Sequence, residues 1–205
     1  MMKKSSILRT VYLTMVVGVM MLTACGRTPP AEFYSLQPVE LSSPVGSIPP
    51  NVALAVGPVA VPADIDRTEI VTRDAGNQVS FSQYHRWAGP LQQSIASVLA
   101  QNIGTLLKTD RVTPFTRENI FQPTHRIVIN INRFDSQLSK EFLLNATWSI
   151  KELKGSKLLL VRNSIIRESL TSSTYEDLVA VQSKALAALS EEMARAVIER
   201  VHKGQ

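Results

Sequence analysis

Strands are the first elements that the alternation of apolar and polar positions predicts. Residues 126–134 (RIVININRF) alternate isoleucine with polar residues, which predicts a strand with one buried face. Residues 142–153 and 158–170 flank a turn at 154–157, so these three strands are predicted to form an antiparallel meander. Further strands are predicted at 33–37, 52–61 and 111–115. Within the second of these, Pro58 indicates a bulge or an edge. Residues 70–73 and 78–82 are predicted to pair as a hairpin.

Two other segments have the three-to-four-residue period of an amphipathic helix. The first covers residues 91–106 and begins after a Gly-Pro pair. The second begins with Ser173 or Thr174 as its N-cap, with acidic residues in its first turn; its apolar stripe runs through Val201, and Gly204 ends it. The order of elements predicts an α+β fold in which two long amphipathic helices pack on one face of a mainly antiparallel sheet.

The chain begins with a positively charged segment followed by an apolar one. Lys3, Lys4 and Arg9 precede an apolar run of 12 residues at 11–22. A membrane-spanning helix needs about 20 apolar residues, whereas a shorter run after positive charges is typical of a secretory signal peptide. We therefore expect residues 1–24 to be removed from the mature protein.

The leader ends in Leu22, Thr23, Ala24 and Cys25, an order that resembles the lipobox of bacterial lipoproteins. The small side chains fit the signal peptidase that cuts before Cys25, and the thiol receives a diacylglyceryl group and further acylation. An ordinary signal peptide with a chance cysteine is the alternative. Because Cys25 is the only cysteine in the chain and directly follows the small residues, we expect it to carry the lipid.

The covalent lipid on Cys25 also predicts a location, and we expect no other cofactor. Two or more acyl chains anchor a protein stably. Gly26 is not the Asp that resembles an inner-membrane retention signal, so the expected address is the periplasmic face of the outer membrane. The seven residues 26–32 reach about 23 Å when extended. We therefore expect a lipidated tether over 25–32 and a single α+β domain over 33–205.

Composition and charge narrow the possible partners. The formal net charge is +5, but the leader holds three cations and no acid, so the mature chain carries +2. No basic run remains after the leader, and we expect no nucleic-acid partner. A single cysteine excludes an intrachain disulfide and a cysteine-based metal site.

Patterns that indicate catalysis or metal binding are weak. Asp64 and Asp66, with Glu69 nearby, form a candidate carboxylate pair, but we favour a solvated loop. Neither a nucleophile motif nor a nucleotide-binding motif occurs in the sequence, so we expect that the protein is not an enzyme. The three histidines, which lack the spacing of metal ligands, are His85, His125 and His202.

One short segment is a candidate partner interface. Tyr84, His85, Arg86 and Trp87 combine two aromatic rings with cationic groups directly before the first helix. Trp, Tyr and Arg are frequent anchors of interfaces. The alternative, which we favour, is that Tyr84 and Trp87 join strand and helix in the core. Both interpretations hold if Trp87 is buried while His85 and Arg86 lie outside.

Several segments of the mature chain follow the order and spacing of a known family. They are Cys25, FYSL at 33–36, ALAVGP at 53–58, Val61-Pro62, Asp66-Arg67, IVTR at 70–73 and residues 84–91 with Trp87-Ala88. In these features the chain resembles the PqiC family of ABC-type transport auxiliary lipoproteins. The resemblance implies a non-catalytic protein that supports envelope integrity and docks with MCE-domain proteins, which span the periplasm and carry lipids. It also implies a homo-oligomer, with a ring of copies facing the end of the MCE tunnel.

Two other functions remain open. One is a periplasmic lipid-binding module, with an acyl chain held between sheet and helices, although an ordinary core explains its lining residues better. The other is a structural lipoprotein of another envelope assembly machine. The lining residues of the lipid-binding module would be Ile127, Ile129, Ile131, Leu91 and Ile95.

Overall fold

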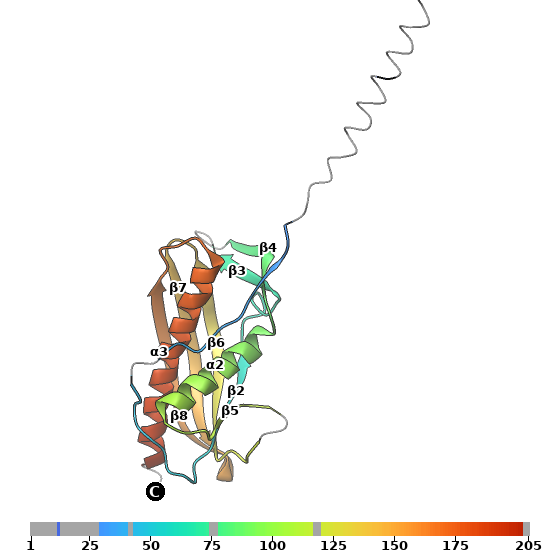
Figure 1. Ribbon diagram of the computed structural model, residues 1–205. Helices are drawn as coiled ribbons and strands as arrows, with labels where there is room; N and C mark the ends of the chain where they lie inside the picture. The colour runs from blue at the N-terminus through green and yellow to red at the C-terminus, as the bar shows by residue number, and fades with distance from the viewer. Residues whose placement is uncertain (1–11, 13–28, 41–42, 74–77, 117–119, 203–205) are drawn as a thin grey trace, which may run out of the picture. The chain divides into compact units, whose positions relative to one another are not determined.

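The chain divides into two units, Met1–Pro30 and Ala31–Gln205, and the second holds every strand and both long helices described below (Figure 1). Within the residues that this computed structural model describes, no helix has both the length and the apolar character needed to cross a bilayer. The described residues are Tyr12, 29–40, 43–73, 78–116 and 120–202.

Five strands form the larger sheet in the order β5-β2-β6-β7-β8. The predicted meander is confirmed: β6 (His125–Gln137), β7 (Glu141–Glu152) and β8 (Lys157–Ser169) pair antiparallel. A short 3-10 helix, η1 (Lys154–Ser156), forms the turn between β7 and β8. On the other side of β6, β2 (Leu54–Ala60) pairs in parallel with β6 and with β5 (Val112–Pro114).

The bulge predicted at Pro58 is confirmed. The register between β2 and β6 shifts between Val56 and Val59, since proline has no N–H to donate to the ladder. Gly57 beside it has a φ of +123°, a backbone conformation that glycine adopts without strain. Because β2 has a neighbour on each side, the proline marks a bulge inside the sheet rather than an edge strand.

Three strands form a smaller sheet in the order β1-β4-β3. The predicted hairpin is present, because β3 (Glu69–Arg73) and β4 (Val79–Trp87) pair antiparallel, while its predicted turn at 75–77 lies outside the described residues. Parallel to β4 runs β1 (Glu32–Tyr34). An ion pair of 3.2 Å between Arg73 Nε and Asp135 Oδ1 joins this sheet to the end of β6.

The α+β class is confirmed, and the sheet arrangement is corrected. The strands form two mixed sheets rather than one mainly antiparallel sheet, because β1–β4, β5–β2 and β2–β6 are parallel pairs. Parallel neighbours need a crossover connection, and here β3, β4 and the first long helix provide it between β2 and β5. Hydrophobic period alone does not encode the direction of such pairs.

Both predicted helices are present and cover the same face of the larger sheet (Figure 1). They are α2 (Leu91–Leu106) and α3 (Tyr175–His202). Thr174 caps α3, because its Oγ1 accepts a hydrogen bond of 3.3 Å from the backbone N–H of Asp177. The largest side chains buried between helices and sheet include Trp148, Phe142, Leu99, Ile103, Ile127 and Ile129.

The face of the larger sheet away from the helices is polar at its centre. Asn132 Nδ2 donates to Thr147 Oγ1 over 2.9 Å and to Asn145 Oδ1 over 3.1 Å. Asn163 Nδ2, from β8, donates to the same two acceptors. The predicted alternation in β6 is therefore correct: isoleucines face the helices and asparagines face outward.

Candidate partner interface

The residues predicted to carry and process the lipid lie outside the described part of the chain. They are Cys25 and the signal-peptidase recognition residues Leu22, Thr23 and Ala24. Lipid attachment at Cys25 stays a prediction. The described domain begins a few residues later, where the chain enters the smaller sheet at Glu32.

The segment Tyr84–Trp87 forms the last part of β4. Trp87 is only 6% exposed, and its backbone N–H donates to Thr68 O over 2.7 Å. For Trp87 the core interpretation therefore holds. Tyr84, His85 and Arg86 are half-buried, so their side chains retain surface that a partner can reach, and their role in an interface stays a prediction.

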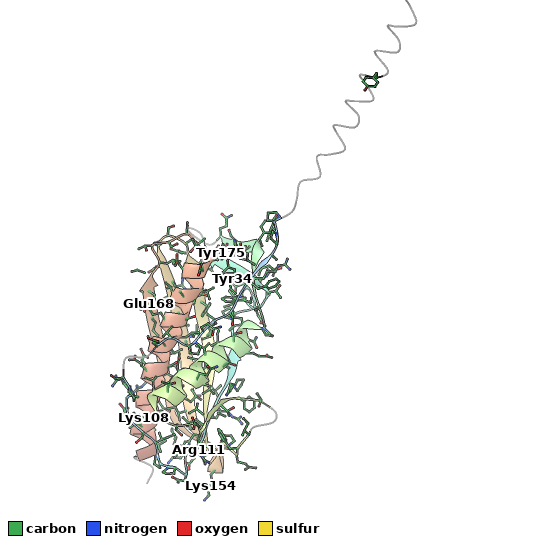
Figure 2. All side chains as sticks on the ribbon, in the orientation of Figure 1. Tyr34, Lys108, Arg111, Lys154, Glu168 and Tyr175 are labelled. Atoms are coloured by element: carbon green, nitrogen blue, oxygen red, sulfur yellow. The ribbon has the colours of Figure 1, made fainter. Side chains whose placement is uncertain are left out.

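His85 is the centre of a cluster that joins three elements. Its ring stacks on Tyr175 at the start of α3, with centroids 4.0 Å apart. Its Nδ1 lies 3.2 Å from Tyr34 Oη and 3.3 Å from Glu32 Oε2, both on β1. Because β1, β4 and α3 all contribute, the cluster fixes the start of the domain to its last helix; Figure 2 shows Tyr34 and Tyr175 close together at one end.

The hydrogens in this cluster can be assigned from donor counting. Tyr34 has one phenolic hydrogen, which goes to Glu32 Oε2 over 2.6 Å. His85 Nδ1 must then carry a hydrogen if it is to bond to the phenol oxygen. Burial, followed by the hydrogen bond to Glu32 and the negative charge of that residue, raises the pKa of Tyr34 to about 12. The phenol therefore stays protonated at neutral pH.

Arg86 and its neighbours form the opposite face of the smaller sheet. Phe33, Arg86 and Glu69 lie in one row across β1, β4 and β3, so their side chains share a face. Arg67 pairs with Glu69 over 2.9 Å and lies 3.9 Å above the ring of Phe81. The exposed fractions of Phe33 and Phe81 are 65% and 45%. This surface interleaves aromatic rings with cations, a combination that is frequent among the anchors of interfaces.

Sequence reasoning found His85 and Arg86 but not the side chains that surround them. Tyr175 is 90 positions from His85 along the chain, and the sequence pattern at Phe33 predicts only a strand. The aromatic residues at both ends of the domain were the available signal. Their meeting depends on the parallel β1–β4 pair and on where α3 begins, which the sequence pattern does not specify.

The candidate carboxylate pair does not assemble. Asp64 Oδ2 accepts from Arg73, Asp66 Oδ2 accepts from Gln92 over 2.8 Å, and Glu69 pairs with Arg67. Each carboxylate thus has its own partner on a different element, which agrees with the loop interpretation. In the described residues there is no group of three or more side chains from His, Cys, Asp and Glu that is arranged to hold a metal ion.

The histidines are also dispersed. His125, at the start of β6, is half-buried, and its Nδ1 lies 2.9 Å from Thr124 Oγ1. Burial lowers the pKa of His125, so its ring is neutral in the fold at neutral pH. The side chain of His202 lies outside the described part.

A hollow of about 530 Å³ lies between α2, the β2 bulge and the end of β5, and Gly57, Pro58, Ala96 and Phe115 line part of it. The residues expected to line an acyl-chain pocket do not line it, because all five are packed in the core with exposures of 2% or less. They are Ile127, Ile129, Ile131, Leu91 and Ile95.

Comparison with known families and structures agrees with this fold. Residues 34–194 match the family described as ABC-type transport auxiliary lipoprotein component. A crystal structure of an uncharacterized protein superposes with a TM-score of 0.68 at 18% identity, covering 82% of this chain and 99% of the other. A DUF330-family protein from Xanthomonas campestris gives 0.67 at 14% identity, covering 85% and 98%. Among curated proteins, none matches the sequence.

Proposed function

The chain belongs to the family of ABC-type transport auxiliary lipoprotein components, and we propose that it is a non-catalytic outer-membrane lipoprotein that docks with a periplasm-spanning, MCE-type lipid transport complex. In this role it supports the integrity of the envelope. The observation that carries the proposal is the family match, which runs from β1 to the second half of α3 and so includes almost the whole described domain.

Anchoring is the first part of the proposed mechanism. Acylated Cys25 holds the protein in the inner leaflet of the outer membrane, since two or more chains bind a bilayer stably. Seven residues separate Cys25 from Phe33, and they span about 23 Å at most. The domain therefore stays near the membrane, on the side where a periplasmic complex arrives.

Docking is the second part. The half-buried surface of Tyr84, His85 and Arg86, together with the exposed Phe33, offers aromatic and cationic anchors for a partner or for a second copy. We expect the copies to form a ring that faces the end of the tunnel protein. Light scattering of the detergent-solubilised lipoprotein measures the copy number directly, and a monomer at all concentrations would exclude the ring.

Replacement of Cys25 tests the anchor. We expect Cys25→Ser to fractionate with soluble periplasmic proteins and to lose envelope function, while Arg27→Ser, a matched change two residues later, behaves as wild type. Mass spectrometry of the membrane-extracted N-terminal peptide checks the lipid itself. A Cys25→Ser protein that stays in the membrane and keeps its function would contradict the proposal.

Capture of the partner tests the docking. After crosslinking in cells, an MCE-domain protein should co-purify with the wild-type chain and be depleted from the Cys25→Ser sample. Recovery of a different envelope machine instead would support the structural-lipoprotein alternative. An MCE-domain gene and a permease gene beside this one would be a simple independent check.

A further inference from the structure

Four strands of the larger sheet begin or end at the same place. Backbone hydrogen bonds join Leu54 N to Arg111 O (2.8 Å), Thr124 N to Ala53 O (2.8 Å) and Leu153 N to Thr124 O (2.9 Å). The starts of β5, β2 and β6 therefore lie beside the end of β7 and the η1 turn. Six cations gather at this end of the sheet, which we call the basic end: Lys108, Arg111, Arg126, Lys151, Lys154 and Lys157.

The cations of the basic end have no carboxylate partners in the part of the chain that the structure describes. Every ion pair between described residues lies elsewhere, on the smaller sheet, on the middle or far end of the long strands, or on α3. Arg111 and Arg126 instead lie over the rings of Phe121 and Phe115, at 5.7 and 4.2 Å. Five of the six residues are exposed, and Arg126 is half-buried.

Two of these cations oppose each other within the sheet. Arg126 and Lys151 are Cα partners across the antiparallel β6–β7 pair, so their side chains project from the same face at neighbouring positions. Like charges directly opposite each other destabilise a sheet. Glu152 does not lie between them, because it is the next residue along β7 and projects from the other face. The fold therefore retains a repulsion that does not help its own stability.

The basic end is far from the point where the tether enters the domain. Figure 2 shows Lys108, Arg111 and Lys154 at one end and Tyr34 and Tyr175 at the other. The 13 residues of β6 run between the two ends, a distance of about 40 Å. If the chain is anchored through Cys25, as proposed above, the basic end is available to a component that approaches across the periplasm.

We propose that the basic end binds an acidic, partly apolar segment of the transport partner protein. This inference rests on the proposed function and adds to its docking step a second surface, at the end of the domain opposite Tyr34 and Tyr175. Exposed apolar side chains accompany the cations, since Leu158 is the Cα partner of Lys151 and is 53% exposed. A protein surface with Asp or Glu beside apolar residues satisfies both features, whereas a row of phosphates satisfies only the charges.

Two lysines in equivalent turns give a matched test. Lys154 lies in the turn between β7 and β8 at the basic end, and Lys140 lies in the turn between β6 and β7 at the other end; both are exposed. In the full lipidated chain we expect Lys154→Glu to reduce crosslinking to the transport partner by at least about threefold and to weaken envelope function. Lys140→Glu should leave both unchanged, and both variants should fractionate with the membrane.

Second-site suppression identifies the chemistry of the partner. Suppressors of Lys154→Glu should replace an Asp or Glu by a neutral or basic residue in one envelope protein. If suppressors instead alter lipid composition, or if the purified chain binds vesicles of phosphatidylglycerol and phosphatidylethanolamine through Lys154 but not Lys140, the basic end binds anionic lipid and the proposal is wrong. Equal behaviour of the two variants would also overturn it, while leaving the anchor and the proposed function intact.

Replacement of Lys151 distinguishes a role in docking from a role in stability. Lys151→Gln removes the repulsion with Arg126, so we expect a higher urea midpoint together with weaker crosslinking to the partner. A lysine retained for stability would lower the midpoint when replaced. A raised midpoint with undiminished crosslinking would mean that the opposed cations are not part of the docking surface.

Discussion

The imidazole of His85 lies almost flat against the ring of Tyr175, with the ring planes 24° apart. The contact links β4 of the smaller sheet to the first residue of α3. Tyr34 approaches both rings, with its centroid 5.7 Å from that of His85 and 6.4 Å from that of Tyr175. Three elements that enter the fold at different points of the chain thus meet in one aromatic contact.

Removal of the Tyr175 ring should loosen this junction. We expect Tyr175→Ala to lower the free energy of unfolding by about 1–3 kcal/mol, because both a stacked pair and partly buried apolar area are lost. Tyr175→Phe keeps the ring and should lie within about 0.5 kcal/mol of wild type. Urea unfolding followed by circular dichroism measures both variants. An alanine variant as stable as the phenylalanine variant would show that the stack contributes nothing.

High pH should destabilise the domain through Tyr34. Its pKa is raised to about 12 in the fold, whereas an unfolded tyrosine ionises near pH 10. Between these values the folded phenol keeps its proton and the unfolded one loses it, so the stabilisation is complete below about pH 10 and is lost as pH rises towards 12. Tyr34→Phe should therefore lose less stability than wild type across this window.

Unfolding of the two proteins at several pH values from neutral to strongly alkaline checks this prediction. Tyr84→Phe is the matched control, because Tyr84 lies on β4 outside the Glu32 contact. If the free energy of unfolding falls with pH equally in Tyr34→Phe and Tyr84→Phe, the fold does not raise the pKa of Tyr34.

Replacement of Ser164 should lower the stability of the domain more than the small size of its side chain indicates. Its Oγ accepts a hydrogen bond of 2.9 Å from Trp148 Nε1, and it also donates to Glu192. Trp148 is 1% exposed, so Ser164→Ala leaves a buried indole N–H without an acceptor. We expect a loss of about 1–3 kcal/mol in the free energy of unfolding. Ser169→Ala, an exposed position on the same strand, is the control and should change stability little.

If Cys25 carries the proposed lipid, the residue after it should decide to which membrane the protein is sorted. Gly26→Asp creates the pattern that resembles an inner-membrane retention signal, so we expect the protein to move from the outer-membrane to the inner-membrane fraction of a sucrose gradient. Gly26→Ser is the control and should stay in place. If wild type already fractionates with the inner membrane, the address predicted from Gly26 is wrong.

The meander and both helices were predictable because each carries its own period. Ile127, Ile129 and Ile131 specify a strand with one buried face wherever that strand is placed, and the stripe from Leu91 to Leu106 specifies a helix in the same way. The parallel pairs of β2 were not predicted, although its unbroken apolar run at 52–61 is typical of a strand buried on both faces.

The two candidate surfaces also differ in how far the sequence predicts them. Tyr84–Trp87 was found because four informative residues are adjacent in sequence. The basic end was not, since its cations extend from Lys108 to Lys157 and no basic run brings them together. Only the register of β5, β2, β6 and β7 places them side by side. Surfaces assembled from strand ends depend on topology, which local pattern does not contain.

The short strand β1 determines how the domain resists force. If the chain is anchored through Cys25, as proposed, the load from a bound partner reaches the domain at Glu32. β1 pairs in parallel with β4 through three residues, and a pull directed along β1 would load their hydrogen bonds in shear, so that these bonds would stretch together rather than open one after another. Tyr34 and Glu32, held by His85, reinforce the same joint. The β1–β4 pair and the His85 contacts would then resist unfolding at the point where a bound partner pulls on the chain.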